Sequence, residues 1–230
     1  MFSQFDFDVI ERSWHYLFFT GMAFTLQLTV LAMTGGIVLG TLLAMARLSS
    51  FRVLSMVAGA YVNLMRGIPL ILVIFWFYFL VPYIGQWLTG ADQPVRVGAF
   101  ASCLTTFILF EACYYCEIMR AGIQSISRGQ VAAGYALGLN YWQCMGSVVL
   151  PQAFRNMAPL LLTQTIVLFQ DVSLVYVLSM PDFLGAASKV AQRDGRLVEM
   201  YLFVALVYFV MSYTLSGLVK RLESRIAIIR

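Results

Sequence analysis

The sequence predicts an all-α integral membrane protein with about five transmembrane helices and additional short cytoplasmic helices. Hydrophobic residues make up 61% of the 230-residue chain and charged residues only 11%, whereas a soluble domain carries about 25% charged residues. A membrane-spanning helix needs about 20 apolar residues, and the chain contains several long uncharged runs. We therefore expect five or six crossings and no separate soluble domain.

The first expected crossing follows the uncharged run from Tyr16 to Ala46. Asp6, Asp8 and Glu11 precede this run, where a cleavable secretory signal would carry Lys or Arg, so we expect the helix to remain in the mature protein. The later crossings are expected at about 68–81, 97–119, 157–179 and 200–219.

The uncharged run from Val53 to Met65 is too short to be a crossing of its own. At ~1.5 Å per residue it reaches about 20 Å, whereas the hydrocarbon core is about 30 Å thick. The run is therefore expected either to lie at the membrane interface or to extend the second crossing.

Five crossings place the two ends of the chain on opposite sides of the membrane, and the positive-inside rule then orients them. A cytoplasmic C-terminus collects ten of the fifteen Lys and Arg residues. These ten are Arg47, Arg52, Arg66, Arg120, Arg128, Arg155, Lys220, Arg221, Arg225 and Arg230. The segment between the third and fourth crossings is then cytoplasmic.

That segment, from Gly129 to Ala153, is broken by glycines and predicts two short helices in series. The first, from Gln130 to Leu137, would stack three alanines on one small-residue face, and Gly138 would make the chain reversal that glycine tolerates best. The alanines of this face are Ala132, Ala133 and Ala136.

The second short helix is expected from Asn140 to about Leu150. Asn140 is a good N-cap with Gln143 three residues later, in the pattern of a capping box, and Pro151 should end the helix. One apolar stripe of this helix would hold Trp142, Met145 and Val149. Such a helix pair would suit docking into another protein's groove; an ordinary interfacial loop is the alternative.

The same segment resembles the EAA loop of permease subunits of type I ABC importers. The residues that carry the resemblance are Gly129-Gln130, Ala132-Ala133, Ala136-Leu137-Gly138 and Leu150-Pro151-Gln152-Ala153. In that family the loop is the coupling helix, which seats in a cleft of the ATP-hydrolysing subunit. The resemblance therefore assigns contact with the ATPase to Gln130, Ala132, Ala133, Gly138, Leu150 and Pro151. The motif's glutamate is replaced by Ala132, and its following alanine pair by Ala133-Gly134.

Other segments are similar to signatures of the polar amino acid branch of this family. They are Tyr61-Val62-Asn63, Arg66-Gly67-Ile68-Pro69-Leu70, Glu117-Ile118-Met119-Arg120-Ala121-Gly122-Ile123 and Gln170-Asp171-Val172-Ser173-Leu174. Within the branch, the sequence around Glu111 and around Asp171 looks most like the permeases of Gram-negative glutamate/aspartate importers. Importers of glutamine, basic amino acids or cystine are the alternatives.

The resemblance implies a chain of three parts in a bacterial inner membrane. Residues 1–15 would be a periplasmic N-terminal segment, 16–220 the type I permease domain, and 221–230 a cytoplasmic tail. It also implies a second homologous permease subunit, two ATPase subunits, a periplasmic amino-acid-binding protein and an amino acid substrate as partners, within membrane lipid and without nucleic acid. ATP and Mg would be bound by the ATPase subunits, since this chain has no GxxxxGK[ST] motif.

Ionisable residues inside a membrane are costly and are candidates for function. Asp171 lies late in the fourth crossing without a basic neighbour in its own helix, and its carboxylate would suit an α-ammonium group. Gln164 lies two turns earlier on the same face, and the further candidates for substrate or pathway contact are Gln170, Ser173 and Glu111. A structural bond to a neighbouring helix is the alternative for Asp171.

Glu117 differs from these candidates, because Arg120 follows it at three residues and a local ion pair is the favoured interpretation. A self-contained secondary transporter that uses Glu111 and Asp171 as an ion relay is the rival function, but an odd number of crossings without visible repeats argues against it. The sequence offers no set of nucleophile, base and acid that would indicate catalysis.

The four cysteines, including the Cys113-Tyr-Tyr-Cys116 pair, are interpreted as core residues without a disulfide or metal. His15 is interpreted as an interfacial anchor.

Overall fold

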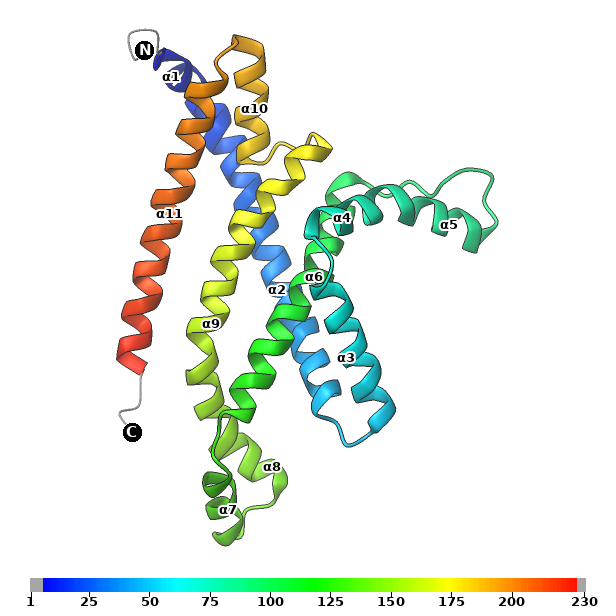
Figure 1. The fold of residues 1–230 in the computed structure, drawn as a ribbon, viewed down its shortest axis with the longest axis vertical. Helices are drawn as coiled ribbons and strands as arrows, with labels where there is room; N and C mark the ends of the chain where they lie inside the picture. Colours follow the sequence, from blue (N-terminus) through cyan, green and yellow to red (C-terminus); the bar gives the residue numbers. More distant parts are fainter. Residues whose placement is uncertain (1–5, 227–230) are drawn as a thin grey trace. The chain divides into compact units, whose positions relative to one another are not determined.

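The computed structural model describes residues 6–226, and within that range it is all-helical without a β-strand (Figure 1). The helices follow one another in this order: α1 (Asp8–His15), η2 (Tyr16–Met22), α2 (Ala23–Leu48), α3 (Arg52–Arg66), α4 (Leu70–Phe75), η3 (Trp76–Leu80), α5 (Val81–Thr89), α6 (Ala99–Gln124), α7 (Arg128–Ala136), α8 (Tyr141–Cys144), η4 (Met145–Val149), α9 (Leu150–Asp171), η5 (Val172–Leu178), α10 (Phe183–Asp194) and α11 (Leu197–Ile226).

Within residues 6–226, five continuous helical stretches are long and apolar enough to cross a membrane. They are Asp8–Leu48, Leu70–Thr89, Ala99–Gln124, Tyr141–Leu178 and Leu197–Ile226. This confirms the predicted all-α membrane architecture. The first and last stretches are longer than the apolar runs that predicted them, because a helix continues through polar residues for as long as its backbone hydrogen bonds continue.

The expected helix end near Leu150 is wrong. Pro151 lacks an N–H group and crowds the carbonyl four residues earlier, but the π-helical turns of η4 come directly before it and let the helix continue into α9. The side-chain amide of Gln152 donates a 2.8 Å hydrogen bond to the Val148 carbonyl at this point. The second helix of the hairpin is therefore continuous with the fourth apolar helix.

The run from Val53 to Met65 forms a helix of its own, α3, and does not extend the second apolar helix. Gly67 follows its last residue, and Pro69 has an extended ψ of 132° before α4 begins. The residue before a proline is disfavoured in the helical region, so the Gly-Ile-Pro sequence separates the two helices. The prediction that α3 lies at the membrane interface stays a prediction.

The chain divides into two compact units. The first contains the residues up to Thr34, together with Ile68–Ile108 and Ile166–Leu215. The second contains Gly35–Gly67, Leu109–Thr165 and the residues from Ser216.

The core of the first unit forms where η2 packs against α10. A Cβ atom on Gly21 would lie 2.9 Å from the Ala186 Cβ and 3.1 Å from the Phe183 Cα, so glycine permits this close approach. The Thr25 hydroxyl accepts a 2.9 Å hydrogen bond from the Phe183 backbone N–H. Apolar packing and one buried polar bond therefore hold α10 in place.

The core of the second unit forms where the C-terminal half of α2 packs on α6. A Cβ on Gly40 would lie 2.8 Å from the Cβ of Tyr115, whose side chain is fully buried. The Tyr61 hydroxyl of α3 donates a 3.0 Å hydrogen bond to the Leu109 carbonyl of α6. These contacts bring α2, α3 and α6 together in the unit that also contains the helical hairpin α7–α8.

Candidate functional site

The first candidate site is the hairpin of α7 and α8, whose reversal follows the predicted local signals. Gly138 has a φ of 83°, in the left-handed region that favours glycine. The Asn140 side chain accepts a 3.0 Å bond from the Gln143 N–H, and the Gln143 side chain accepts a 2.9 Å bond from the Asn140 N–H. The predicted capping box is therefore confirmed.

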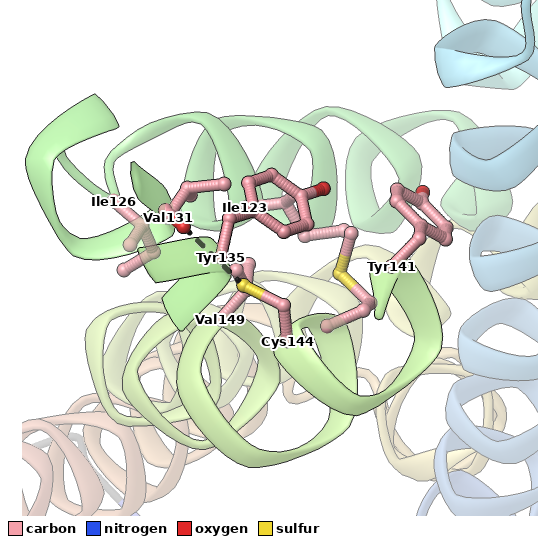
Figure 2. A pocket seen from close by; sticks show the side chains of 8 residues that line it. Ile123, Ile126, Val131, Tyr135, Tyr141, Cys144 and Val149 are labelled. Carbon is pink, nitrogen blue, oxygen red and sulfur yellow. Dashed lines mark hydrogen bonds between the residues drawn. The ribbon is translucent and has the colours of Figure 1, made fainter. Parts of the chain in front are cut away.

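The inner side of the hairpin forms a small, partly open apolar pocket of about 140 Å³ (Figure 2). Its walls are Ile123, Ile126, Val131, Tyr135, Tyr141, Cys144, Met145 and Val149. The predicted stripe is therefore wrong at one position, because Trp142 is 78% exposed. The wide π-helical turn after Cys144 changes the period of the helix, so Tyr141, Met145 and Val149 share the inner face instead.

The Cys144 side chain explains why Gly134 stands where the family motif has alanine. A Cβ on Gly134 would lie 2.8 Å from the Cys144 Sγ, which also contacts the Val131 carbonyl at 3.7 Å. The thiol therefore occupies the space of the missing methyl group, and the departure from the motif is a packing feature. The departure was visible in the sequence, but its packing partner was not.

The outer surface of the hairpin is apolar and exposed. Leu137 is 83% exposed, and the exposed residues around it include Gln130, Ala132, Ala133, Ala136, Gly138 and Trp142. Leu150 and Pro151, at the start of α9, are also exposed. An apolar surface of this kind marks an interaction site with protein or lipid.

The second candidate site is the set of polar residues inside the apolar helices, of which Glu111 and Gln164 meet. Glu111 on α6 is fully buried, and its Oε2 accepts a 3.0 Å hydrogen bond from the Gln164 amide on α9. One turn further on, the hydroxyls of Tyr115 and Thr165 are 3.0 Å apart. Both contacts join α6 to α9 in the second unit, so Glu111 makes a polar bond between helices.

Asp171 lies at the last residue of α9, where the helix tightens into the 3₁₀ segment η5. Its side chain is partly buried, and within residues 6–226 it makes neither a hydrogen bond nor an ion pair. Its neighbour Gln170 donates a 3.0 Å bond to the Ser212 hydroxyl of α11, and Ser173 is partly buried. The structure thus gives Gln164 and Gln170 other partners and leaves the Asp171 carboxylate available.

The family described as binding-protein-dependent transport system inner membrane component matches residues 36–228. The chain belongs to this family. The permease resembles the glutamate/aspartate import permease protein GltK of Escherichia coli O6:H1, with 52% identity over 97% of this chain and 99% of GltK. It also resembles the glutamine transport system permease protein GlnP of Escherichia coli K12, with 31% identity over 98% of this chain and all of GlnP.

Solved structures support the same fold. The crystal structure of an amino acid ABC transporter with histidines aligns with this permease at a TM-score of 0.86 and 31% identity, over 96% of this chain and 99% of that one. The MetNI methionine ABC transporter aligns at a TM-score of 0.68 and 18% identity, over 96% of this chain and 98% of that one. The type I permease fold expected from the sequence is therefore confirmed.

Most of the ion-pair cluster around Glu117 of this permease was not predicted from the sequence. The predicted pair with Arg120 is present, at 2.7 Å between Nη2 and Oε2. Arg47 of α2 also donates to the Glu117 carboxylate, and Arg66 of α3 lies 3.9 Å from it. Neither arginine is near Glu117 in sequence, and the only signal was their position near the same expected side of the membrane.

The remaining candidate groups of the sequence are the cysteines and His15. The four cysteines are buried and unpaired with one another, and no cluster of three metal-ligating side chains occurs within residues 6–226. His15 stacks on Phe19 with ring centroids 4.6 Å apart.

Proposed function

We propose that this chain is a permease subunit of an ATP-driven importer of glutamate and aspartate. The observation that carries the proposal is the 52% identity to GltK over nearly the whole of both chains. The identity to the glutamine permease GlnP is 31% over a similar length, so an acidic substrate is better supported than glutamine. A basic amino acid or cystine is an alternative within the same function.

In this proposal the hairpin α7–α8 is the coupling element that seats in a cleft of an ATPase subunit. Its exposed alanines and Leu137 support the assignment, because an apolar outer surface on a helical hairpin favours docking. The remaining partners are a second permease subunit, a second ATPase subunit and a periplasmic amino-acid-binding protein. ATP and Mg are bound by the ATPase pair, and this chain supplies half of the path through the inner membrane.

The proposed orientation places the N-terminus in the periplasm and the C-terminus in the cytoplasm. It rests on the ten Lys and Arg residues that this arrangement collects on the cytoplasmic side. Cysteines introduced at Arg52 and Arg225 should react with an impermeant reagent from the cytoplasmic side, and a cysteine at Arg193 from the periplasmic side. Labelling of Arg52 and Arg225 from opposite sides would contradict the orientation.

Asp171 is the proposed contact for the substrate's α-ammonium group. Its support is a partly buried carboxylate without a partner in the described chain, whereas Glu111 already accepts a bond from Gln164. A charge-assisted bond contributes about 1.5 to 3 kcal/mol, or roughly ten- to a hundredfold in affinity. Asp171→Asn should therefore lower uptake at limiting substrate by that factor, while the binding protein's own affinity stays unchanged.

The Asp171→Asn result separates three readings. Poor assembly or loss of heat stability in detergent would indicate a structural bond in place of substrate contact. Stable complexes that transport at the native rate at limiting substrate would exclude both roles and return attention to Glu111 or to the partner permease.

The whole proposal is tested by transport with purified parts. The chain is reconstituted in vesicles with its co-purifying permease, ATPase and binding protein, and uptake of labelled glutamate, aspartate and glutamine is compared with and without ATP. Uptake of both acidic amino acids that depends on ATP and on the binding protein is expected. Uptake of glutamine alone would select the alternative substrate, and uptake by the isolated chain without ATP would indicate a secondary transporter.

A further inference from the structure

The two carboxylate oxygens of Glu117 have different kinds of partner. Oε2 accepts from Arg120 of the same helix, at 3.2 Å from Nε and 2.7 Å from Nη2. Oε1 accepts from Nη1 of Arg47 on α2, and Nη1 of Arg66 on α3 is 3.9 Å away from that same oxygen. One oxygen is therefore bound within α6, and the other faces two arginines from two other helices.

Arg66 is held beside this oxygen without being bonded to it. Its guanidinium carbon is 5.4 Å from the centroid of the Tyr114 ring, within the range of a cation–π contact. Within the described residues it makes no hydrogen bond, and its side chain is 42% exposed, against 17% for Arg47. The guanidinium fork of Arg66 therefore retains free donors next to a carboxylate oxygen that Arg47 occupies.

An exchange of Arg47 for Arg66 on Oε1 would leave the charge of the cluster unchanged. In both arrangements the carboxylate keeps Arg120 and one further guanidinium, and the arginine that gives up its bond differs. Leaving a partly buried charge without a partner is costly, and the Arg47 side chain is 17% exposed against 42% for Arg66, so the arrangement seen here is the more stable one until the hairpin moves. A displacement that changes this balance would shift the cluster between two discrete arrangements, which is the physical requirement for an element that transmits a conformational change.

The cluster is mechanically continuous with the coupling hairpin inside the second unit. Seven residues after Glu117, α6 ends at Gln124, and the next turn is fixed to α9 by a 2.8 Å bond from the Asn156 amide to the Ser125 hydroxyl. Ile126 packs with Val149 in a small buried core at the base of the hairpin. A displacement of the hairpin would therefore be transmitted to the last turns of α6, where Glu117 lies two turns before the end.

We propose that Glu117 is a positioning residue of the coupling pathway, whose Oε1 exchanges Arg47 for Arg66 as the hairpin moves. The exchange would release α6 from the end of α2 and attach it to the end of α3. Arg47 bonds Oε1 in the arrangement seen here, and Arg66 bonds it in the other. The inference rests on the proposed function, because it takes the hairpin as the contact with the ATPase.

The exchange predicts that the two arginines act in opposite directions on ATP hydrolysis. Arg47→Gln removes the partner seen here and shifts the cluster toward Arg66, whereas Arg66→Gln traps the arrangement seen here. In the reconstituted complex, one variant should raise and the other should lower the rate of ATP hydrolysis without substrate. Each change should be about fivefold, at the lower end of typical coupling factors.

The matched control is Arg52→Gln, which removes an exposed arginine of the same unit that has no ion pair in the described chain. It should leave hydrolysis and uptake unchanged. If a Gln variant fails to assemble, it is replaced by the corresponding Lys variant, which keeps the charge but loses the planar fork. The two Lys variants must then change the rate of ATP hydrolysis in opposite directions, by a smaller factor.

A purely structural cluster would lower assembly and hydrolysis in the same direction for both arginines, and this result would overturn the exchange. An unchanged rate in either variant would also overturn it. Failure of the proposed function is a different observation, since the unmodified complex would then show no ATP-dependent uptake at all.

Discussion

The hairpin α7–α8 and the helix α10 are built with the same local devices. Each is a short helical element that follows an apolar helix, and each contains a helix with a side-chain N-cap, Asn140 for α8 and Asp182 for α10. Each also uses a left-handed glycine, Gly138 with a φ of 83° and Gly195 with a φ of 67°. The two elements therefore use the same kinds of cap and turn to change the direction of the chain.

The two elements differ in where their apolar residues go. Phe183, Ala186 and Ala187 of α10 are fully buried in the core of the first unit. The alanines of α7 are exposed, and Leu137 beside them is 83% exposed. An apolar surface that the chain itself does not cover is available to a partner, so the comparison separates an element that stabilises the chain from one that is suited to docking.

The largest expected effect is on α10, from Gly185→Ala. A Cβ at this position would clash with the Met180 carbonyl oxygen, which belongs to the backbone and has no rotamer to change. The N-terminus of α10 must then move, so we expect little assembled protein in detergent extracts, measured by size-exclusion chromatography.

The matched control lies in the hairpin. Apart from its chain neighbours and the backbone of its own helix, a Cβ added to Gly146 would have no atom of the described chain within 4 Å, so Gly146→Ala should leave the yield of assembled protein unchanged. Normal yields from Gly185→Ala would show that α10 is not the rigid, buried element described here.

The second effect is the pH dependence of α10. Burial raises the pKa of the Asp182 carboxyl to about 7, although the amides of Leu184 and Gly185 donate to it. A carboxyl in the unfolded chain has a pKa of about 3.9. The folded state therefore binds this proton more tightly than the unfolded chain does. The resulting contribution to the free energy of unfolding is fully present below about pH 4 and is lost as pH rises through about 7.

Linkage gives a loss of up to about 4 kcal/mol over this pH range. Amide hydrogen exchange of α10, corrected for the intrinsic rate, should show better protection at pH 5 than at pH 8. Asp182→Asn keeps the cap without the charge and should remove the difference. Equal protection of the unmodified helix at both pH values would exclude this role of Asp182.

The third effect is on the hairpin, from Gly138→Val. A left-handed conformation costs a β-branched residue roughly 1 to 2 kcal/mol, but beyond the two neighbouring residues no atom of the described chain lies within 4 Å of the new Cβ. Membrane insertion should therefore survive while uptake and co-purification of the ATPase fall. Gly138→Asn, which tolerates this conformation better, is the control and should keep most of the activity. Normal uptake by Gly138→Val would remove the hairpin from the coupling mechanism.

The smallest effect separates docking from stability. Leu137→Ser removes an exposed apolar side chain, and burial of a leucine contributes about 1.5 to 3 kcal/mol, so ATPase association should weaken about tenfold or more. Thermal stability of the chain itself should not change. Trp87→Ser on α5 is the control, because Trp87 is 81% exposed but lies outside the hairpin. If Leu137→Ser and Trp87→Ser weaken ATPase association equally, the effect follows from the loss of any exposed apolar side chain and not from docking of the hairpin.

The candidate site was predicted from the sequence where its signals are local. The reversal at Gly138 and the capping box of Asn140 depend on residues within one turn, and both are confirmed. The helix end at Pro151 was wrongly expected, since the π-helical turns that carry the chain past this proline have no sequence signature of their own. The stripe through Trp142 failed for the same reason.

Composition and hydropathy by themselves determined that the chain is an all-helical membrane protein, because each segment must satisfy its backbone in lipid on its own. Only the tertiary structure decided the partners of the intramembrane carboxylates. Glu111 bonds Gln164 at a distance of 53 positions along the chain, and Glu117 bonds Arg47 at a distance of 70 positions. Such pairs depend on which helix faces meet and at which height, and this is a property of packing between helices that the polarity of a single segment does not contain.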